Sequence, residues 1–439
     1  MDELIPSMEK LLAPLMPVFR KEVFPTFCNM VVAWLVCLGR RTISRVWETT
    51  GKTRKKNHSA AFRLFSQAVW NFDEVMRVLL VAILQTFIPG MRVWVVIDDT
   101  LCHKRGGKVA FGGIFLDAVL STRKHKTFRF GNNWVMLGLV VSMPFRRDRV
   151  FCLPLLWRVC EKRGKKTKKE HRTKPELAAD MVRTLATWLP GREILVLGDN
   201  AYACKAMLHN RPETVNFIGP ICWNAALTKL KKQRDGREVS SDQRLPTPKE
   251  ILKNDKEWPP QTRMIDFGDG KKRRLRVKVL HVCWKSVAGD CPVAIVLVQD
   301  PKGEWRDEAL VSTNPNLSDY EIITGYCQRW SVEVAFGDAK AHLGFHDPCV
   351  WKKESVERAA PMSWFVGTLV MLWYAREGHN HEKAQRQRPW YVKKVITFTD
   401  MASTCRLAHW ENWWRRRANK CPADKAPFDW LLEYMATAE

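Results

Sequence analysis

Two short apolar runs that lead into aspartates constrain the fold of this chain most strongly. Residues 93–97 precede Asp98 and Asp99, and residues 193–197 precede Gly198 and Asp199. Short runs rich in β-branched residues are typical of strands buried on both faces, as in a sheet covered by helices. We expect each strand to end at its acidic residue, so that the carboxylate points into a cleft while the strand holds it in place.

A third acid lies far downstream, in a segment with the spacing Y-x2-R-x3-E-x6-K. Its members are Tyr326, Arg329, Glu333 and Lys340. At about 100° per residue, the four side chains would fall within an arc of roughly 60° on one helix. Such a face suits a phosphodiester beside a metal ion, because the carboxylate can ligate the metal while the cations bind phosphate oxygens. The alternative is a solvent-exposed face with an Arg329–Glu333 ion pair.

Two aspartates after strands and one glutamate on a helix are the ligands that a pair of divalent cations requires. Mg2+ prefers oxygen ligands and keeps waters that a substrate phosphate can replace. A single aspartate after a strand is more often a turn former or a helix cap. Three acids in this order, together with the basic helix face, favour a metal site.

These residues resemble the DDE transposases of bacterial insertion sequences, in the group marked by a Y-R-E-K signature around the third acid. The resemblance runs from about residue 93 to residue 340, and the segments 130–134 and 328–330 share its character. It implies an RNase H-like catalytic core. It also implies that the chain is a DDE transposase, which cuts and transfers DNA by metal-dependent hydrolysis and transesterification.

The resemblance also implies which residues form the active site. Asp99 becomes the first acid, because the family places a threonine directly after that position, and Asp199 and Glu333 become the second and third. Asp98 would then face the opposite side of the strand, since successive side chains alternate. The three acids would hold Mg2+, with Mn2+ as a substitute.

The resemblance assigns the remaining signature residues to DNA. Tyr326, Arg329 and Lys340 would grip the phosphate near the cleaved end. In this group a hairpin at the transposon end is common, and it requires a flipped base stacked on an aromatic side chain. Trp305, shortly before the acid-bearing helix, is the first candidate for this stacking, and Trp284 is the second.

The composition favours a polyanionic partner. The chain of 439 residues has 72 Lys and Arg against 46 Asp and Glu, a formal net charge of +26. Nucleic acid is the first candidate, and an anionic membrane surface is the alternative. No apolar run is long enough to span a membrane, and no basic stretch precedes an apolar core at the N-terminus. Thirteen cysteines without a C-x2-C pair indicate reduced thiols. We therefore expect a bacterial cytoplasmic protein associated with the nucleoid.

Three basic segments are candidates for contact with the DNA backbone. One lies in a turn between two short helices, one is the densest charge block of the chain, and one is a strand with cations on one face. The alternatives are a solvated loop, a mobile charge block and a sheet edge protected by charge. The candidate residues are Arg54, Lys55, Lys56, Lys165, Lys166, Lys168, Lys169, Arg274 and Arg276.

We expect an α/β (α+β) fold, with an RNase H-like mixed sheet flanked by helices and interrupted by a β-rich insertion. The predicted parts are a helical N-terminal DNA-binding domain (1–88), the first part of the core (89–221), the insertion (222–315), the last part of the core with the Glu333 helix (316–348) and a helical C-terminal region (349–439). Predicted strands besides those before the aspartates are 135–143, 150–157, 275–284, 293–299 and 308–312, and predicted helices include 175–188 and 361–376.

The predicted function is cut-and-paste transposition of an insertion sequence. The protein would bind double-stranded DNA at terminal inverted repeats, cleave the ends through a hairpin and join them to target DNA as a homodimer. Two alternatives stay open. One is an RNase H-like nuclease or resolvase that performs no strand transfer, and the other is a DNA-binding regulator derived from a transposase.

Overall fold

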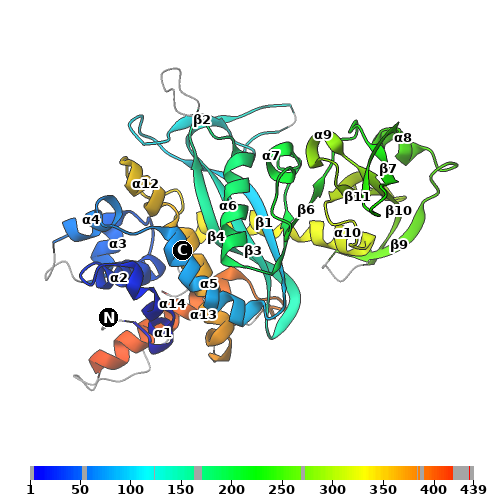
Figure 1. Ribbon diagram of the computed structural model, residues 1–439. Coiled ribbons are helices and arrows are strands. Elements are labelled where there is room, and N and C mark those ends of the chain that lie inside the picture. The colour runs from blue at the N-terminus through cyan, green and yellow to red at the C-terminus, as the bar shows by residue number, and fades with distance from the viewer. Residues whose placement is uncertain are drawn as a thin grey trace.

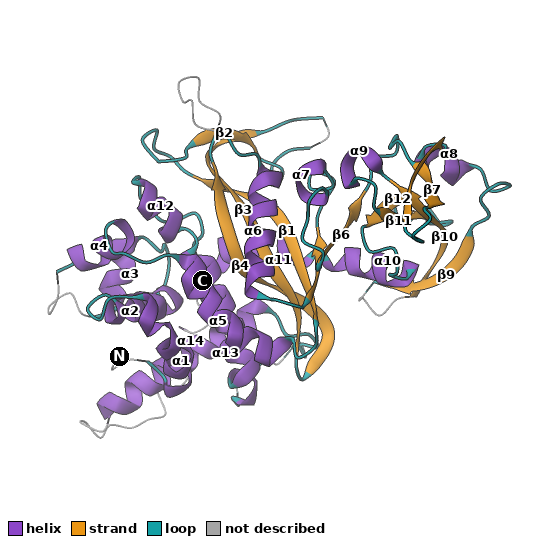
Figure 2. Ribbon diagram, viewed as in Figure 1, coloured by secondary structure: helices purple, strands orange, loops and turns teal. Residues whose placement is uncertain are grey.

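The computed structural model shows a helical body, a central sheet and a smaller β-rich lobe (Figures 1 and 2). It describes residues 4–51, 57–122, 124–162, 171–267, 272–382, 384–385, 390–418 and 435. In Figure 1 the helical body lies on one side of the sheet and the β-rich lobe on the other, so the sheet connects the two.

The central sheet has the strand order of an RNase H-like core, which confirms the predicted fold class. Its order is β4-β3-β1-β5-β6, with β2 (Gly113–Leu116) beside the start of β3. β1, β5 and β6 run parallel, whereas β3 is antiparallel to both β1 and β4. The five strands are β1 (Arg92–His103), β3 (Phe128–Met143), β4 (Arg146–Cys160), β5 (Glu193–Leu197) and β6 (Val215–Pro220).

β1 is longer than predicted, and this changes the position of two acids. The prediction that β1 ends at Asp99 is wrong, because the chain continues to pair with β3 as far as His103 opposite Gly131. Asp98 and Asp99 therefore lie in the middle of a strand, whose alternation sends their side chains to opposite faces. Asp199, in contrast, follows the end of β5 almost directly, as predicted.

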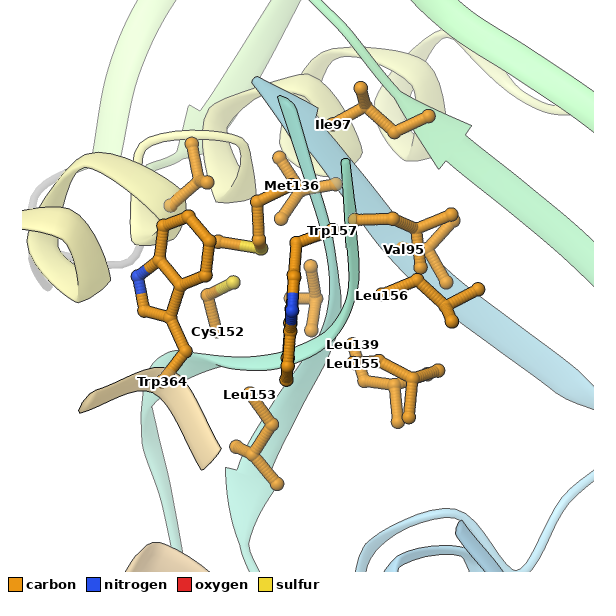
Figure 3. Packing of buried hydrophobic residues seen from close by; sticks show 14 of the residues in the cluster. Val95, Ile97, Met136, Leu139, Cys152, Leu153, Leu155, Leu156, Trp157 and Trp364 are labelled. Atoms are coloured by element: carbon orange, nitrogen blue, oxygen red, sulfur yellow. The ribbon is translucent and has the colours of Figure 1, made fainter. Parts of the chain in front are cut away.

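Helices cover both faces of the sheet. α6 (Lys174–Trp188) packs on β3 and β4 from the face toward which Asp99 points. It begins at a capping box, in which Thr173 and Glu176 each bond the other's backbone N–H. On the opposite face lie α11 (Ser331–His342) and α13 (Met362–Arg376), and both pack on β4. In Figure 3 the Trp364 ring of α13 lies beside Met136, Cys152 and Trp157, whose ring centroid is 5.7 Å away.

The two ends of the chain form one helical body. α13 packs against α1, α2, α5 and α14, and α12 packs against α4. Phe365 of α13 stacks obliquely on Phe27 and Phe72 at ring-centroid distances of 5.5 and 5.8 Å. The helices described between Pro6 and Phe87 and those between Lys353 and Ala418 are thus neighbours in space. Their helices are α1 (Pro6–Leu12), η1 (Ala13–Val18), α2 (Phe24–Val36), α3 (Ile43–Thr49), α4 (Ser59–Ser66), α5 (Phe72–Phe87), α12 (Lys353–Ala359), η2 (Gly378–Asn380) and α14 (Phe398–Ala418).

The predicted β-rich insertion is a lobe whose strands continue the central sheet. β12 pairs with β6 of the core, and the order then runs β12-β11-β10-β7-β8, with β9 beside β10. This pairing joins the lobe to the strand that follows Asp199. The elements are α7 (Lys205–Leu208), β7 (Thr228–Lys232), β8 (Glu238–Arg244), α8 (Pro248–Lys253), β9 (Gln261–Asp266), β10 (Lys272–Cys283), α9 (Lys285–Ala288), β11 (Pro292–Gln299) and β12 (Glu308–Ser312).

The helix predicted to carry Tyr326 through Lys340 is broken in two. α10 (Asp319–Gln328) ends just before Arg329, and α11 begins at Ser331. Between them the backbone N–H groups of Arg329, Trp330 and Val332 donate to carbonyls three residues earlier, which tightens the chain into a turn. The prediction of one continuous helical face is therefore wrong, because Tyr326 lies on one helix and Glu333 on the next.

Two further expectations concern cysteines and membranes. Each cysteine in the described ranges is a free thiol, as the scattered spacing predicted. None of the helices in those ranges combines the length and apolar character needed to cross a bilayer.

The close approach of β3 to β1 at Gly131 gives a test of the strand pairing. A Cβ added to Gly131 would lie 2.2 Å from the carbonyl oxygen of Cys102, so the backbone of β1 would have to move. Gly131→Ala should lower the free energy of unfolding by about 1–3 kcal/mol, measured by urea denaturation. Gly107→Ala is the control, because a Cβ there meets open space. Equal stability of the two variants would contradict the register.

Candidate active site

Four acidic residues come from the middle of β1, the end of β5 and the start of α11. Val96 of β1 pairs with Leu197 of β5, and each lies two residues before an aspartate, so Asp98 and Asp199 are neighbours across the parallel strands. Asp99 follows on β1, and Glu333 comes from the first turn of α11. The structure therefore places Asp98 and Asp199 side by side, with Glu333 on the helix that packs on this part of the sheet.

Arg329 connects the central strand to the acid-bearing helix. Its Nη1 donates to Oδ2 of Asp98 at 3.1 Å, and its Nη2 donates to Oε1 of Glu333, also at 3.1 Å. The guanidinium is largely buried, with 15% of the side chain exposed. Asp98, on the α11 face of the sheet, is therefore the β1 acid that shares a partner with Glu333.

Asp99 has different partners on the α6 face. The Lys174 ammonium, at the start of α6, donates to Oδ2 of Asp99 at 2.6 Å. The Tyr202 hydroxyl lies 3.5 Å from Oδ1 of Asp99, and its ring is buried. The predicted separation of the Asp98 and Asp99 side chains is present, with Asp98 rather than Asp99 on the Glu333 side.

Burial and like charges shape the protonation of the aspartates. Burial raises the pKa of Asp98 to about 7; its hydrogen bond from the Asp99 N–H and the Arg329 charge oppose this, whereas the Asp199 charge adds to it. Burial also raises the pKa of Asp199, against its hydrogen bond from the Ala201 N–H and the charge of Arg329. Carboxylates in such surroundings favour a cation, whether a side chain or a metal ion.

The residues of the Y-R-E-K spacing divide into two groups. Tyr326 lies beside Arg329, with the guanidinium carbon 5.9 Å from the phenol ring centroid, and Arg329 contacts Glu333. Lys340 lies near Asp117 and the buried Cys102 thiol, at the far end of β1. Three members of the signature therefore cluster at the acids, and the fourth lies about two helical turns away along α11.

The aromatic candidates for base stacking differ in exposure. Trp305 is 38% exposed and stacks on Phe267, with ring centroids 4.2 Å apart. The guanidinium of Arg273 lies over the Phe267 ring, 5.0 Å from its centroid. Trp284 is only 5% exposed, so it has no free face to offer. Trp305 remains the candidate.

The basic segments are only partly described. Seven of the nine candidate residues lie outside the described residues, namely Arg54, Lys55, Lys56, Lys165, Lys166, Lys168 and Lys169. On β10, Arg274 is exposed, whereas Arg276 donates to Asp255 and Gln299. Lys278, on the same face, is buried and donates to the carbonyls of Ile251 and Leu252 at the end of α8. Arg276 and Lys278, two of the cations on this face of β10, therefore serve the lobe itself.

Three residues of this site were not predicted from the sequence. Tyr202 and Lys174 contact Asp99, and Glu308 lies near the charge of Arg329. An aromatic residue three positions after Asp199 was a usable signal for Tyr202. Lys174 and Glu308 are distant in the chain from the acids, so spacing carried no signal for either.

The carboxylates suit a divalent cation by type, although their oxygens are engaged by cationic side chains. Within the described residues, no three His, Cys, Asp or Glu side chains are arranged closely enough to hold a metal ion. Arg329 and Lys174 occupy the positions beside the carboxylates where a metal's charge would act. The donors fit a hard cation such as Mg2+, provided that these ion pairs rearrange.

The strand order and the flanking helices define an RNase H-like fold. The family model described as DDE superfamily endonuclease matches residues 14–273, well over half of the chain, and the protein belongs to this family. Enzymes of this superfamily act on DNA and generally use divalent metals. The match covers β1 and Asp199 and ends before the Y-R-E-K spacing. The search of curated proteins gave no match.

The raised pKa of Asp98 predicts a pH dependence of stability. Because its pKa is about 7 in the folded protein and 3.8 in the unfolded chain, its contribution to stability is full below pH 3.8, falls as the pH rises toward 7, and is constant at higher pH. From about pH 5 to about pH 7 in EDTA, the wild type should lose more stability than Asp98→Asn, measured by urea denaturation. Asp148→Asn, at an exposed pair with Arg146, should follow the wild type. If the stability of the wild type and of Asp98→Asn changed with pH in parallel, the raised pKa of Asp98 would be contradicted.

Proposed function

We propose that the protein is a transposase that excises and inserts an insertion sequence through metal-dependent phosphodiester chemistry. The observation that carries the proposal is the contact of Arg329 with both Asp98 on the central strand and Glu333 on α11, in an RNase H-like sheet. Asp199 follows the neighbouring parallel strand beside Asp98, and Asp99 lies on the other face of β1. Family membership supports a DNA-cleaving enzyme. The strongly basic composition supports a DNA substrate.

The acids would hold Mg2+, for which Mn2+ can substitute. The bound metal would activate water or a DNA 3′-hydroxyl and stabilise the leaving oxygen. The residues are Asp199, Glu333 and one aspartate of β1. The resemblance to insertion-sequence transposases implies Asp99 for this place, whereas the shared contact with Arg329 favours Asp98. We therefore infer Asp98 as the first acid and Asp99 as the alternative.

Arg329 has a second task in this proposal. In the free protein it donates hydrogen bonds to Asp98 and Glu333. If a metal neutralised these acids, one side of the planar guanidinium could donate to a phosphate oxygen instead. Tyr326, beside it, can bond the same phosphate. Trp305, exposed on the lobe that β12 joins to β6, can stack a flipped base of a hairpin end.

The proposal extends to assembly and location. Excision of an element requires two cut ends, so we propose a homodimer on paired terminal inverted repeats, with target DNA bound next. Light scattering of the complex with DNA ends measures this. A cytoplasmic, nucleoid-associated location agrees with the same charge. The second candidate function, a nuclease or resolvase without strand transfer, uses the same acids and is separated from the first by product analysis.

Substitution of the acids tests the chemistry. The rate of DNA cleavage with Mg2+ should fall in each of three variants: Asp98→Ala, Asp199→Ala and Glu333→Ala. The loss should exceed the roughly 10- to 100-fold decrease expected when a residue that only supports a metal ligand is removed. Binding of DNA ends should persist, because it depends mainly on cations. Asp99→Ala should retain more activity than Asp98→Ala.

A larger loss of cleavage activity in Asp99→Ala than in Asp98→Ala would establish Asp99 as the first acid. Near-normal cleavage by Asp199→Ala would remove the whole assignment. A labelled end with a free 3′-hydroxyl, incubated with a target duplex, reports strand transfer. Cleavage without any joined product would favour the nuclease or resolvase.

The guanidinium of Arg329 is tested by a charge-conserving change. Arg329→Lys keeps the charge but cannot bond two oxygens in one plane, so it should impair hairpin formation and strand transfer more than the first nick, by about tenfold or more. Arg77→Lys, at an exposed pair with Glu74 on α5, is the control and should behave as wild type. If Arg329→Lys performed the first nick, hairpin formation and strand transfer at wild-type rates, a single positive charge at this position would be enough for all three steps.

A further inference from the structure

A cavity lies at the far end of β1, where the loop after β1 faces the segment after α11. It has a volume of about 980 Å3. We call it the basic pocket and define it by Arg40, Lys104, Arg105, Lys108, His346 and Trp351, all of which line it. From Asp99 the strand continues four residues to His103 at the pocket, a distance of roughly 13 Å. The pocket is therefore separate from the acid cluster.

The cations of the pocket are not neutralised by the protein. The Lys104 ammonium donates to the backbone carbonyls of His346 and Pro348 at 3.1 and 2.9 Å, which fix its position without cancelling its charge. Arg105 and Lys108 are exposed. In the ranges that the structure covers, no carboxylate lies within ion-pair distance of these three cations. Two acids lie nearby. Asp347, which lines the pocket, accepts a hydrogen bond from the Arg41 backbone N–H at 2.8 Å, and Asp117 is engaged by His103 at 2.6 Å. Such a pocket favours an anion.

One wall of the pocket is aromatic. Trp351 is 61% exposed, and its carbonyl accepts a hydrogen bond from the Ala110 N–H at 3.0 Å, which ties this wall to the basic loop. Deeper in, the rings of His103 and His346 stack with centroids 4.8 Å apart and planes within 6°. Nδ1 of His346 accepts from the His103 N–H, so the neutral ring carries its proton on Nε2. The pocket therefore offers a flat apolar face and a neutral donor beside its cations.

We propose that the basic pocket binds an unpaired nucleotide of the DNA strand, with the phosphate on Lys108 and Arg105 and the base against Trp351. Cations beside an exposed aromatic ring are the combination that binds single strands, because every base has a face that can stack. The cavity volume lies at the upper end of the range of small-ligand sites, which is sufficient for a nucleotide. Stacking on Trp351 requires that the base be unpaired.

Lys340 links this pocket to the acids. It lies on α11 seven residues after Glu333, or roughly 10 Å along the helix, and lies near Asp117 and Cys102 at the pocket end. A strand that leaves the acids along α11 would therefore pass Lys340 and reach Lys108 and Trp351. The choice of DNA as the ligand rests on the proposed function, but the pocket's binding does not depend on cleavage.

The test measures binding without catalysis. Full-length protein in EDTA is titrated into a labelled single-stranded oligonucleotide and a blunt duplex of the same sequence, and fluorescence anisotropy gives both affinities. Trp351→Ala should weaken single-strand binding by about fivefold or more, the lower limit for loss of one stacked base, and duplex binding much less. Lys108→Ala should reduce the salt dependence of single-strand binding by about 0.7 in slope.

Controls outside the pocket separate site from surface. Trp390→Ala removes a tryptophan that is 79% exposed elsewhere, and Lys285→Ala removes a lysine that is 64% exposed in a pair with Asp290. Both should bind as wild type, and all variants should keep the wild-type unfolding temperature. Wild-type affinity of Trp351→Ala for the single strand, or equal losses on single strand and duplex, would overturn the proposal.

The outcome is independent of the proposed function. If the variants lose single-strand binding but the wild type cleaves no DNA with Mg2+, the pocket stands and the transposase function falls. If the wild type cleaves DNA and the variants bind normally, the function stands and the pocket falls.

Discussion

A guanidinium shared by two carboxylates connects the parts of this molecule that form its site. Arg329 donates to Asp98 on the central strand and to Glu333 on α11, and thereby fixes the last helix of the core against the first strand. Burying carboxylates at the centre of a sheet is costly unless cations compensate them. Arg329 on one face and Lys174 on the other supply this compensation, so the placement of α6 and α11 is electrostatic as well as hydrophobic.

Because the buried carboxylates need cations, the ion pairs of this site can be replaced by bound ligands. A metal ion and a phosphodiester bring the charges that Arg329 and Lys174 now balance: the metal can take over the acids, and the phosphate can take over the freed cation. The turn between α10 and α11 places Arg329 at a helix junction rather than in a helix interior. Its side chain therefore reaches both the strand and the next helix.

The sheet also organises the surfaces that surround the acids. β12 joins β6, so the lobe with Trp305 is an extension of the core sheet rather than a tethered module. β1 carries the acids in its middle and the basic loop at its end. A DNA strand lying along β1 would meet carboxylates first and unneutralised cations next, an order set by a single strand of the protein.

The sequence alone determined much of the architecture, because local patterns report local structure. The runs before Asp98 and Asp199 predicted the two parallel strands, 308–312 coincides with β12, and 361–376 differs from α13 by one residue. The order of the acids along the chain predicted the elements that carry them in an RNase H-like core, namely β1, the end of β5 and a later helix. The free thiols also followed from cysteine spacing.

Tertiary structure decided what depends on contacts between distant residues. Pairing with β3 lengthened β1 past Asp99, a result of the partner strand rather than of residues 93–97. Alternation predicted that Asp98 and Asp99 would diverge, but only the packing of α6 and α11 on opposite faces decided which acid meets Glu333. Lys174 lies 75 residues from Asp99 in the chain and Arg329 lies 231 residues from Asp98. Ion pairs of this range leave no periodic signal, because they form when the sheet and its helices assemble.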